Sequence, residues 1–131
     1  PSVEDIAQAI AKRDKAKVIP TGATAANRLG FSTQVPMNTE FLTTGSARKL
    51  KLGKRIVTLK HGAPKNFAFR GRLMPELVQA LRSIGEHNVT PEDEVRIGQL
   101  FTETPEKNTI EYDLLLAPVW MRQIIKKGIE Q

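Results

Sequence analysis

The chain has 131 residues, of which 40% are hydrophobic and 26% charged, a composition typical of one globular domain with its own core. It contains no cysteine, which excludes disulfides and thiolate metal sites, and no apolar run approaches the roughly 20 residues that span a bilayer. We therefore expect a single domain over residues 1–131, in a cytoplasmic setting and without membrane contact.

The net charge of +6 is distributed unevenly along the chain. Residues 1–40 carry +1, residues 41–75 carry +9, and residues 76–131 carry −4. The middle stretch holds nine Lys or Arg and no acid, which indicates an acidic partner, with nucleic acid the first candidate. The alternative is a solvated sheet face whose charge the acidic C-terminal half of the same molecule balances.

Hydrophobic periodicity and turn residues predict the elements of the first third of the chain. Ser2 is a good N-cap for the first helix, and Thr21 or Thr24 is suited to cap the second. Gly30 suits the left-handed position that ends a helix. The expected elements are a helix over 3–15, a strand over 17–20, a helix over 23–29 and a strand over 37–43.

A β-hairpin over about 47–60 is the clearest local prediction. Strands over 48–52 and 55–60 flank Gly53 and Lys54, a pair typical of a two-residue type II′ turn. This register makes a largely apolar face from three pairs, which are Leu52 with Arg55, Leu50 with Val57 and Arg48 with Leu59. The other face then carries Lys49, Lys51, Ile56, Thr58 and Lys60.

The basic residues of this region are the candidate binding site for nucleic acid or an acidic protein. They are Arg48, Lys49, Lys51, Lys54, Lys60 and Lys65. A β-ribbon with such a ridge can lie along a phosphate backbone. Charged side chains also deter edge-to-edge pairing of sheets, so a protected edge is the alternative interpretation.

The second half of the chain is predicted to be helical, which with the strands gives an α+β fold: a small, mainly antiparallel sheet covered by several helices. Phe67 and Phe69 lie beside basic residues, as in a base-stacking platform, but we favour the core because only 5% of residues are aromatic. The expected elements are a short turn over 65–69, helices over 73–84 and 91–101, a surface link over 102–109, and a final helical segment over 112–125 interrupted at Pro118. That final segment packs on the domain or docks on a partner.

Residue patterns that support catalysis are missing from the sequence. The two histidines have no neighbour at metal-ligand spacing, and there is no G-x-S-x-G motif. Gly45-Ser46 opens a sequence similar to a nucleotidyltransferase signature, but no acid follows between Glu40 and Glu76 to hold Mg²⁺. We expect no enzymatic activity, no catalytic residue, no metal site and no cofactor.

Three segments carry a family resemblance: VIPTGATAANRLGFSTQVP (18–36), FLTTGSARKLKLGKRIVTLK (41–60) and APKN (63–66), with DLLLAPVWMRQII (113–125) also similar. They resemble the C-terminal domain of AbiEi-type antitoxins, bacterial transcriptional regulators of type IV (abortive infection) toxin–antitoxin systems. The resemblance implies that an N-terminal winged helix-turn-helix is absent here and that the chain is part of a longer protein. It further implies operator DNA, bound mainly by the absent domain, and a nucleotidyltransferase-like toxin as partners.

Overall fold

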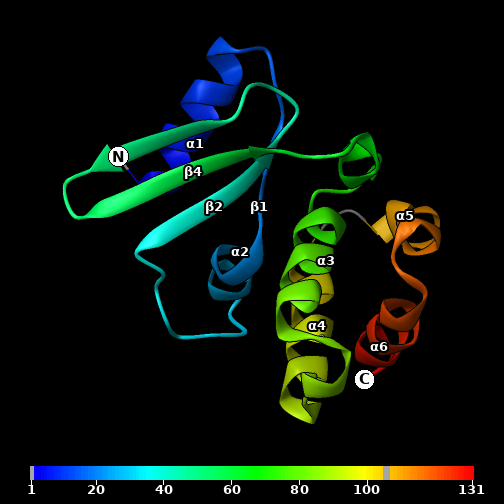
Figure 1. The fold of residues 1–131 in the computed structure, drawn as a ribbon. Coiled ribbons are helices and arrows are strands. Elements are labelled where there is room, and N and C mark those ends of the chain that lie inside the picture. The colour runs from blue at the N-terminus through cyan, green and yellow to red at the C-terminus, as the bar shows by residue number, and fades with distance from the viewer. Residues whose placement is uncertain (1, 105–106) are drawn as a thin grey trace.

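The computed structural model describes residues 2–104 and 107–131, which form a four-stranded sheet and a helical layer (Figure 1). The elements in chain order are α1 (Val3–Arg13), β1 (Val18–Pro20), α2 (Gly22–Arg28), β2 (Asn38–Thr43), β3 (Arg48–Leu52), β4 (Arg55–His61), the 3-10 turn η1 (Pro64–Phe67), α3 (Leu73–Ile84), η2 (Glu86–Asn88), α4 (Pro91–Glu103), η3 (Lys107–Thr109), α5 (Ile110–Leu116) and α6 (Val119–Ile129). The α+β prediction is confirmed.

The sheet has the strand order β1-β2-β4-β3 and is mixed. β1 pairs with β2 and β3 pairs with β4 in antiparallel fashion, whereas β2 and β4 are parallel. The expectation of a mainly antiparallel sheet therefore needs correction at its centre. The chain crosses from β2 to the outer strand β3 and returns as β4 between them, so β4 runs in the direction of β2.

The predicted hairpin is confirmed in its register. Leu52 pairs with Arg55 beside the turn, and the ladder continues through Leu50 with Val57 to Arg48 with Leu59 at the start of β3. Gly53 has φ +62°, while Lys54 is not among the residues with positive φ, as a glycine-first type II′ turn requires. A glycine turn and a period-two pattern that agree specify one register, because a slip by one residue would turn the apolar side chains outward.

Two hydrophobic clusters hold the described residues together. The smaller one lies between α1 and one face of the sheet and is built on Ala7, Phe41, Val57 and Leu59, each at most 2% exposed. The larger one joins α2 to the C-terminal helices; its fully buried members include Ala25, Ala80, Leu77, Leu81, Ile97, Met121 and Ile125. Helix α2 connects the two layers because it packs on both β2 and α3.

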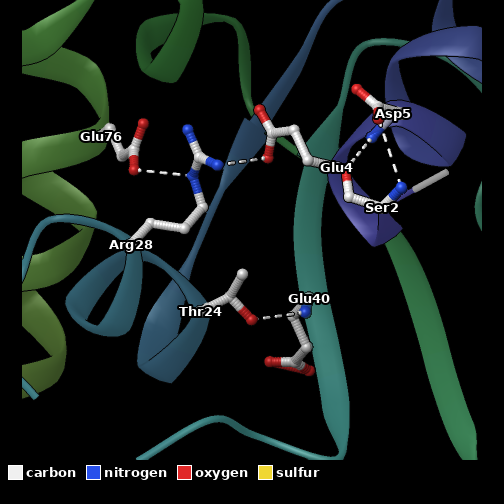
Figure 2. Close-up of polar contacts among 7 residues, drawn as sticks. All are labelled: Ser2, Glu4, Asp5, Thr24, Arg28, Glu40 and Glu76. Carbon is white, nitrogen blue, oxygen red and sulfur yellow. Dashed lines mark hydrogen bonds and ion pairs between the residues drawn. The ribbon is translucent and has the colours of Figure 1, made fainter. Parts of the chain in front are cut away.

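Local capping follows the sequence at the first helix and departs from it at the second. The Ser2 hydroxyl accepts a hydrogen bond from the Asp5 N–H, and the Ser2 N–H donates to the Asp5 carboxylate, which forms a capping box (Figure 2). Thr21 occupies the N-cap of α2, but its hydroxyl donates to Oε1 of Gln79 on α3 at 2.6 Å. The Thr24 hydroxyl accepts from the Glu40 N–H at 2.9 Å (Figure 2), so both threonines link α2 to neighbouring elements.

The C-terminal third is more helical than expected. Helix α4 continues to Glu103 and η3 follows at Lys107, so most of the predicted 102–109 link is structured, while its residues 105–106 lie outside the described ranges. The final segment is two helices, α5 and α6, separated at Pro118 as its fixed φ and missing N–H predict. Gly30 ends α2 with φ +86°, as expected for a C′ glycine.

Candidate functional site

The hairpin places a row of lysines on the face of the sheet that points away from α1. Lys49 and Lys51 of β3 stand opposite Thr58 and Ile56 of β4, and Lys54 lies at the tip of the turn. All three lysines are exposed, and no ion pair of residues 2–104 or 107–131 involves them. We call Lys49, Lys51 and Lys54 the lysine row. Its charge is available to a partner.

Two of the other predicted binding residues are neutralised within the fold. The Arg48 guanidinium lies on the α1 side of the sheet, where its Nε and Nη2 donate to the two carboxylate oxygens of Asp14 at 3.1 and 3.2 Å. Lys60 Nζ lies 2.9 Å from a carboxylate oxygen of Glu40 on the neighbouring strand. The sixth candidate, Lys65, is exposed on η1, outside the hairpin.

A groove of about 810 Å³ opens along β1 on the side of the sheet opposite the hairpin. Glu4 and Gln8 of α1 form one wall, and Phe67 and residues 69–72 with the start of α3 form the other. The base consists of residues 16–20, which include the whole of β1. The groove thus lies at the free edge of the sheet, between α1 and the helical layer.

One wall of the groove is fixed by α5. The carboxylate of Asp113 is 1% exposed and accepts hydrogen bonds from the N–H groups of Arg70 and Gly71, both at 2.7 Å. The Arg70 guanidinium stacks over the Tyr112 ring at 3.6 Å from its centroid. Charge-assisted hydrogen bonds are about twice as strong as neutral ones, so these contacts hold the 70–71 backbone in place.

The two phenylalanines of this region both reach the groove. Phe69 is half-buried and packs against the large helical cluster, which agrees with the interpretation as core. Phe67 is half-buried near Gly62 and lines the groove together with Phe69. The rings therefore serve as packing residues that keep part of their surface available in the groove.

An ion-pair bridge joins three helices beside the groove. Arg28 of α2 points between Glu4 of α1 and Glu76 of α3, with nitrogen–oxygen distances of 3.1 Å to each carboxylate (Figure 2). Burial raises the pKa of the Glu76 carboxyl above its ordinary value of 4.5, and the Arg28 charge opposes this shift. The three residues are 24 and 48 positions apart in the chain and follow no spacing rule, so sequence reasoning did not find them.

Within residues 2–104 and 107–131, no group of three His, Cys, Asp or Glu side chains is arranged to hold a metal ion. No helix in the same ranges is both long and apolar enough to cross a bilayer.

Comparison with known proteins gives a family but no described relative. No curated protein and no solved structure matches the chain. A family model matches residues 1–109, which contain the sheet, the lysine row and α1 to α4. This match covers most of the chain, and the chain therefore belongs to DUF6088, a family of unknown function.

Proposed function

We propose that this chain is a non-enzymatic domain of an antitoxin or transcriptional regulator and that its lysine row contacts the phosphate backbone of nucleic acid. The observation that supports the proposal best is the free charge of Lys49, Lys51 and Lys54 on one exposed hairpin, while Arg48 and Lys60 are paired within the fold. Phosphate contacts supply most non-specific affinity for DNA, and lysine ammonium groups provide them without base-specific geometry.

The regulatory part of the proposal rests on the resemblance to AbiEi-type antitoxins. In such a protein the operator sequence is read mainly by a winged helix-turn-helix, and the domain described here supports repression and antitoxicity. The lysine row would add sequence-independent contacts on DNA already bound. A nucleotidyltransferase-like toxin remains the expected protein partner under this proposal.

The salt dependence of binding to a random-sequence DNA duplex tests the proposal. Three neutralised phosphates give a log–log slope of about −2.7, which corresponds to a loss of roughly 40-fold in affinity between about 50 and about 200 mM salt. Fluorescence anisotropy of a labelled duplex measures this slope directly. Lys49→Glu with Lys51→Glu should reduce the magnitude of the slope to about one or less, because only Lys54 remains.

A matched variant controls for net charge. Arg82→Glu with Lys126→Glu changes two exposed cations of α3 and α6, so both double variants lower the formal charge from +6 to +2. The control should retain a slope near that of the unmodified chain, since exposed charges beyond a Debye length of about 10 Å are screened. Equal losses in both variants, or an unchanged slope in the hairpin variant, would reject the lysine row as the contact surface.

The second candidate function is a protein-interaction module that does not bind nucleic acid. Its support is a run of exposed apolar side chains on α5 and the start of α6, where Leu115 is 68% and Val119 72% exposed. In this case the lysine row meets an acidic protein. The absence of DNA binding even at low salt would favour this module over the first proposal.

A further inference from the structure

The strand β1 lies at one edge of the sheet. The backbone groups on its outer side have no partner strand among the described residues. The Thr21 N–H donates to the Glu40 carbonyl at 3.0 Å, and the Thr44 N–H donates to the Lys17 carbonyl at 3.1 Å. Pairs in an antiparallel ladder alternate between bonded and non-bonded, so residues 17, 19 and 21 bond β2. The N–H and C=O of Val18 and the C=O of Pro20 therefore point away from the sheet.

Pro20 fits this arrangement. A proline lacks the N–H, so it is accommodated in a strand where that group would face outward. Pro20 is buried and Val18 is half-buried, so the accessible part of the outer edge of β1 offers one donor and one acceptor, both from Val18. These are the groups that an added strand would pair with, and such a strand would lie about 4.8 Å away.

The groove provides room for that strand. Its volume of about 810 Å³ lies along residues 16–20, and five extended residues span about 17 Å. Pockets of roughly 300–1,000 Å³ are the usual size for ligands that are largely enclosed. The side chains of an added strand would alternate between the α1 wall, where Gln8 lies, and the opposite wall, where Phe67 and Phe69 lie.

The charge of the groove selects the chemistry of its occupant. The cations that line it are Lys17, Arg28, Arg70 and Arg72, and the acids are Glu4 and Glu76, which gives a formal charge of +2. Both acids are bound to Arg28, so neither is directed at an incoming ligand. Electrostatic complementarity therefore favours an acidic ligand and disfavours a basic one.

We propose that this groove binds an extended acidic peptide segment of a protein partner, which adds to the free edge of β1 as a fifth strand. Main-chain hydrogen bonds to the N–H and C=O of Val18 would supply affinity, and the net positive charge of the groove would supply the preference for acids. A single-stranded nucleic acid is also negatively charged, but it lacks the peptide N–H and C=O groups that would continue the ladder at a strand edge. This site is separate from the lysine row and does not depend on it.

Binding of two synthetic peptides, measured by anisotropy and by amide NMR shifts, tests the proposal. The probes are fluorescein-labelled Glu-Val-Glu-Val-Glu-Val-Glu and its counterpart with lysine in place of glutamate. The acidic peptide should bind at least about tenfold more tightly, a difference worth ~1.4 kcal/mol, and should shift the amide resonance of Val18. Octathymidylate is the matched nucleic-acid probe and should leave the Val18 resonance unchanged.

Three variants locate the site. Val18→Pro removes the outward N–H and should weaken the acidic peptide by tenfold or more, with the fold verified by circular dichroism. Lys17→Glu alters an exposed groove side chain without touching the backbone, so it keeps the test valid if the proline variant fails to fold. It should weaken the acidic peptide by about tenfold and strengthen the basic one. Lys49→Glu with Lys51→Glu should leave peptide binding within about twofold.

Several outcomes would overturn the inference. Loss of peptide binding in the Lys49 and Lys51 variant with retention in the Val18 and Lys17 variants would place the acidic peptide on the lysine row. Shifts of Val18 caused by octathymidylate alone would assign the groove to nucleic acid. The absence of any interaction at millimolar acidic peptide would reject strand addition, whereas the DNA experiment with the lysine row would be unaffected.

Discussion

Replacing Gly128 with alanine tests how closely α6 packs on α4. A Cβ at this position would lie 2.8 Å from both Cβ and Cγ2 of Ile97 and 2.9 Å from the backbone oxygen of Glu94. Carbon atoms in contact stand about 3.5–4.0 Å apart, so α6 must move outward by roughly 0.7–1 Å. The neighbours cannot yield by rotation, because two of the atoms belong to a fully buried β-branched side chain and one to the backbone.

The magnitude follows from two opposing effects. Replacing glycine with alanine in a helix interior stabilises the helix by about 1 kcal/mol, because alanine has the higher helix propensity. Overpacking costs about 1–3 kcal/mol, and a gap of 0.5–1 Å removes roughly a quarter to a half of the dispersion energy of the separated contacts. Because the clash involves the backbone, we take the upper part of the overpacking range. The free energy of unfolding should then fall by about 1–2 kcal/mol in total. For a chain of this length the melting temperature should fall by about 3–12 °C.

Urea unfolding followed by tryptophan fluorescence measures this loss, because the single tryptophan, Trp120, lies on α6 and packs against the large cluster. Gln123→Ala, an exposed change in the same helix, is the control and should stay within about 0.5 kcal/mol. Gly98→Ala should destabilise as well, since its Cβ would lie 2.5 Å from the Gly128 oxygen. Because one outward shift relieves both clashes, the double variant should cost less than the sum. A Gly128→Ala variant as stable as the unmodified chain would refute the close helix crossing.

Two further predictions concern the carboxylates beside the groove. Asp113→Asn should cost about 2–3 kcal/mol, because an amide cannot accept both backbone N–H bonds of Arg70 and Gly71; equal urea midpoints would contradict the anchoring role. Glu76 has a raised pKa in the folded state, chiefly from burial, so its contribution to stability is complete below pH 4.5 and is lost as the pH rises through the folded pKa. The glutamine of Glu76→Gln is neutral at every pH. The stability of this variant relative to the unmodified chain, measured by urea unfolding, should therefore increase from a pH below 4.5 to neutral pH. A relative decrease over that interval would show that the Arg28 contact dominates instead.

The hairpin and most helices were predictable because their signals are local. In β3 and β4 the period-two pattern and the turn glycine are carried by neighbouring residues, and they agree on one register. The N-cap role of Ser2 is likewise a local signal, because it depends on the residue type just before the helix begins. The parallel pairing of β2 with β4 was not predictable in this way. Local sequence does not indicate which strand β4 will lie beside after the chain crosses to β3.

The candidate site was predictable only in part, because neutralisation of charge is a long-range property. Arg48 and Lys49 are adjacent in the chain, yet one binds Asp14, 34 positions away, and the other is free of ion pairs within the described ranges. Lys60 meets Glu40 only because β2 and β4 are neighbours. Composition identifies a basic region, but only the tertiary arrangement reveals that Arg48 and Lys60 are paired with acids of the same chain.

The helices beyond the family match belong to the same structural unit as the groove. The match ends at residue 109, before α5 and α6, yet Met121 and Ile125 are fully buried in the large cluster. Asp113 of α5 also holds the backbone that forms one groove wall. A change that loosens α6 would therefore be transmitted through α5 to the groove, while the lysine row lies on the hairpin at the opposite edge of the sheet. Destabilising the helical layer should thus affect peptide binding before it affects contacts with DNA.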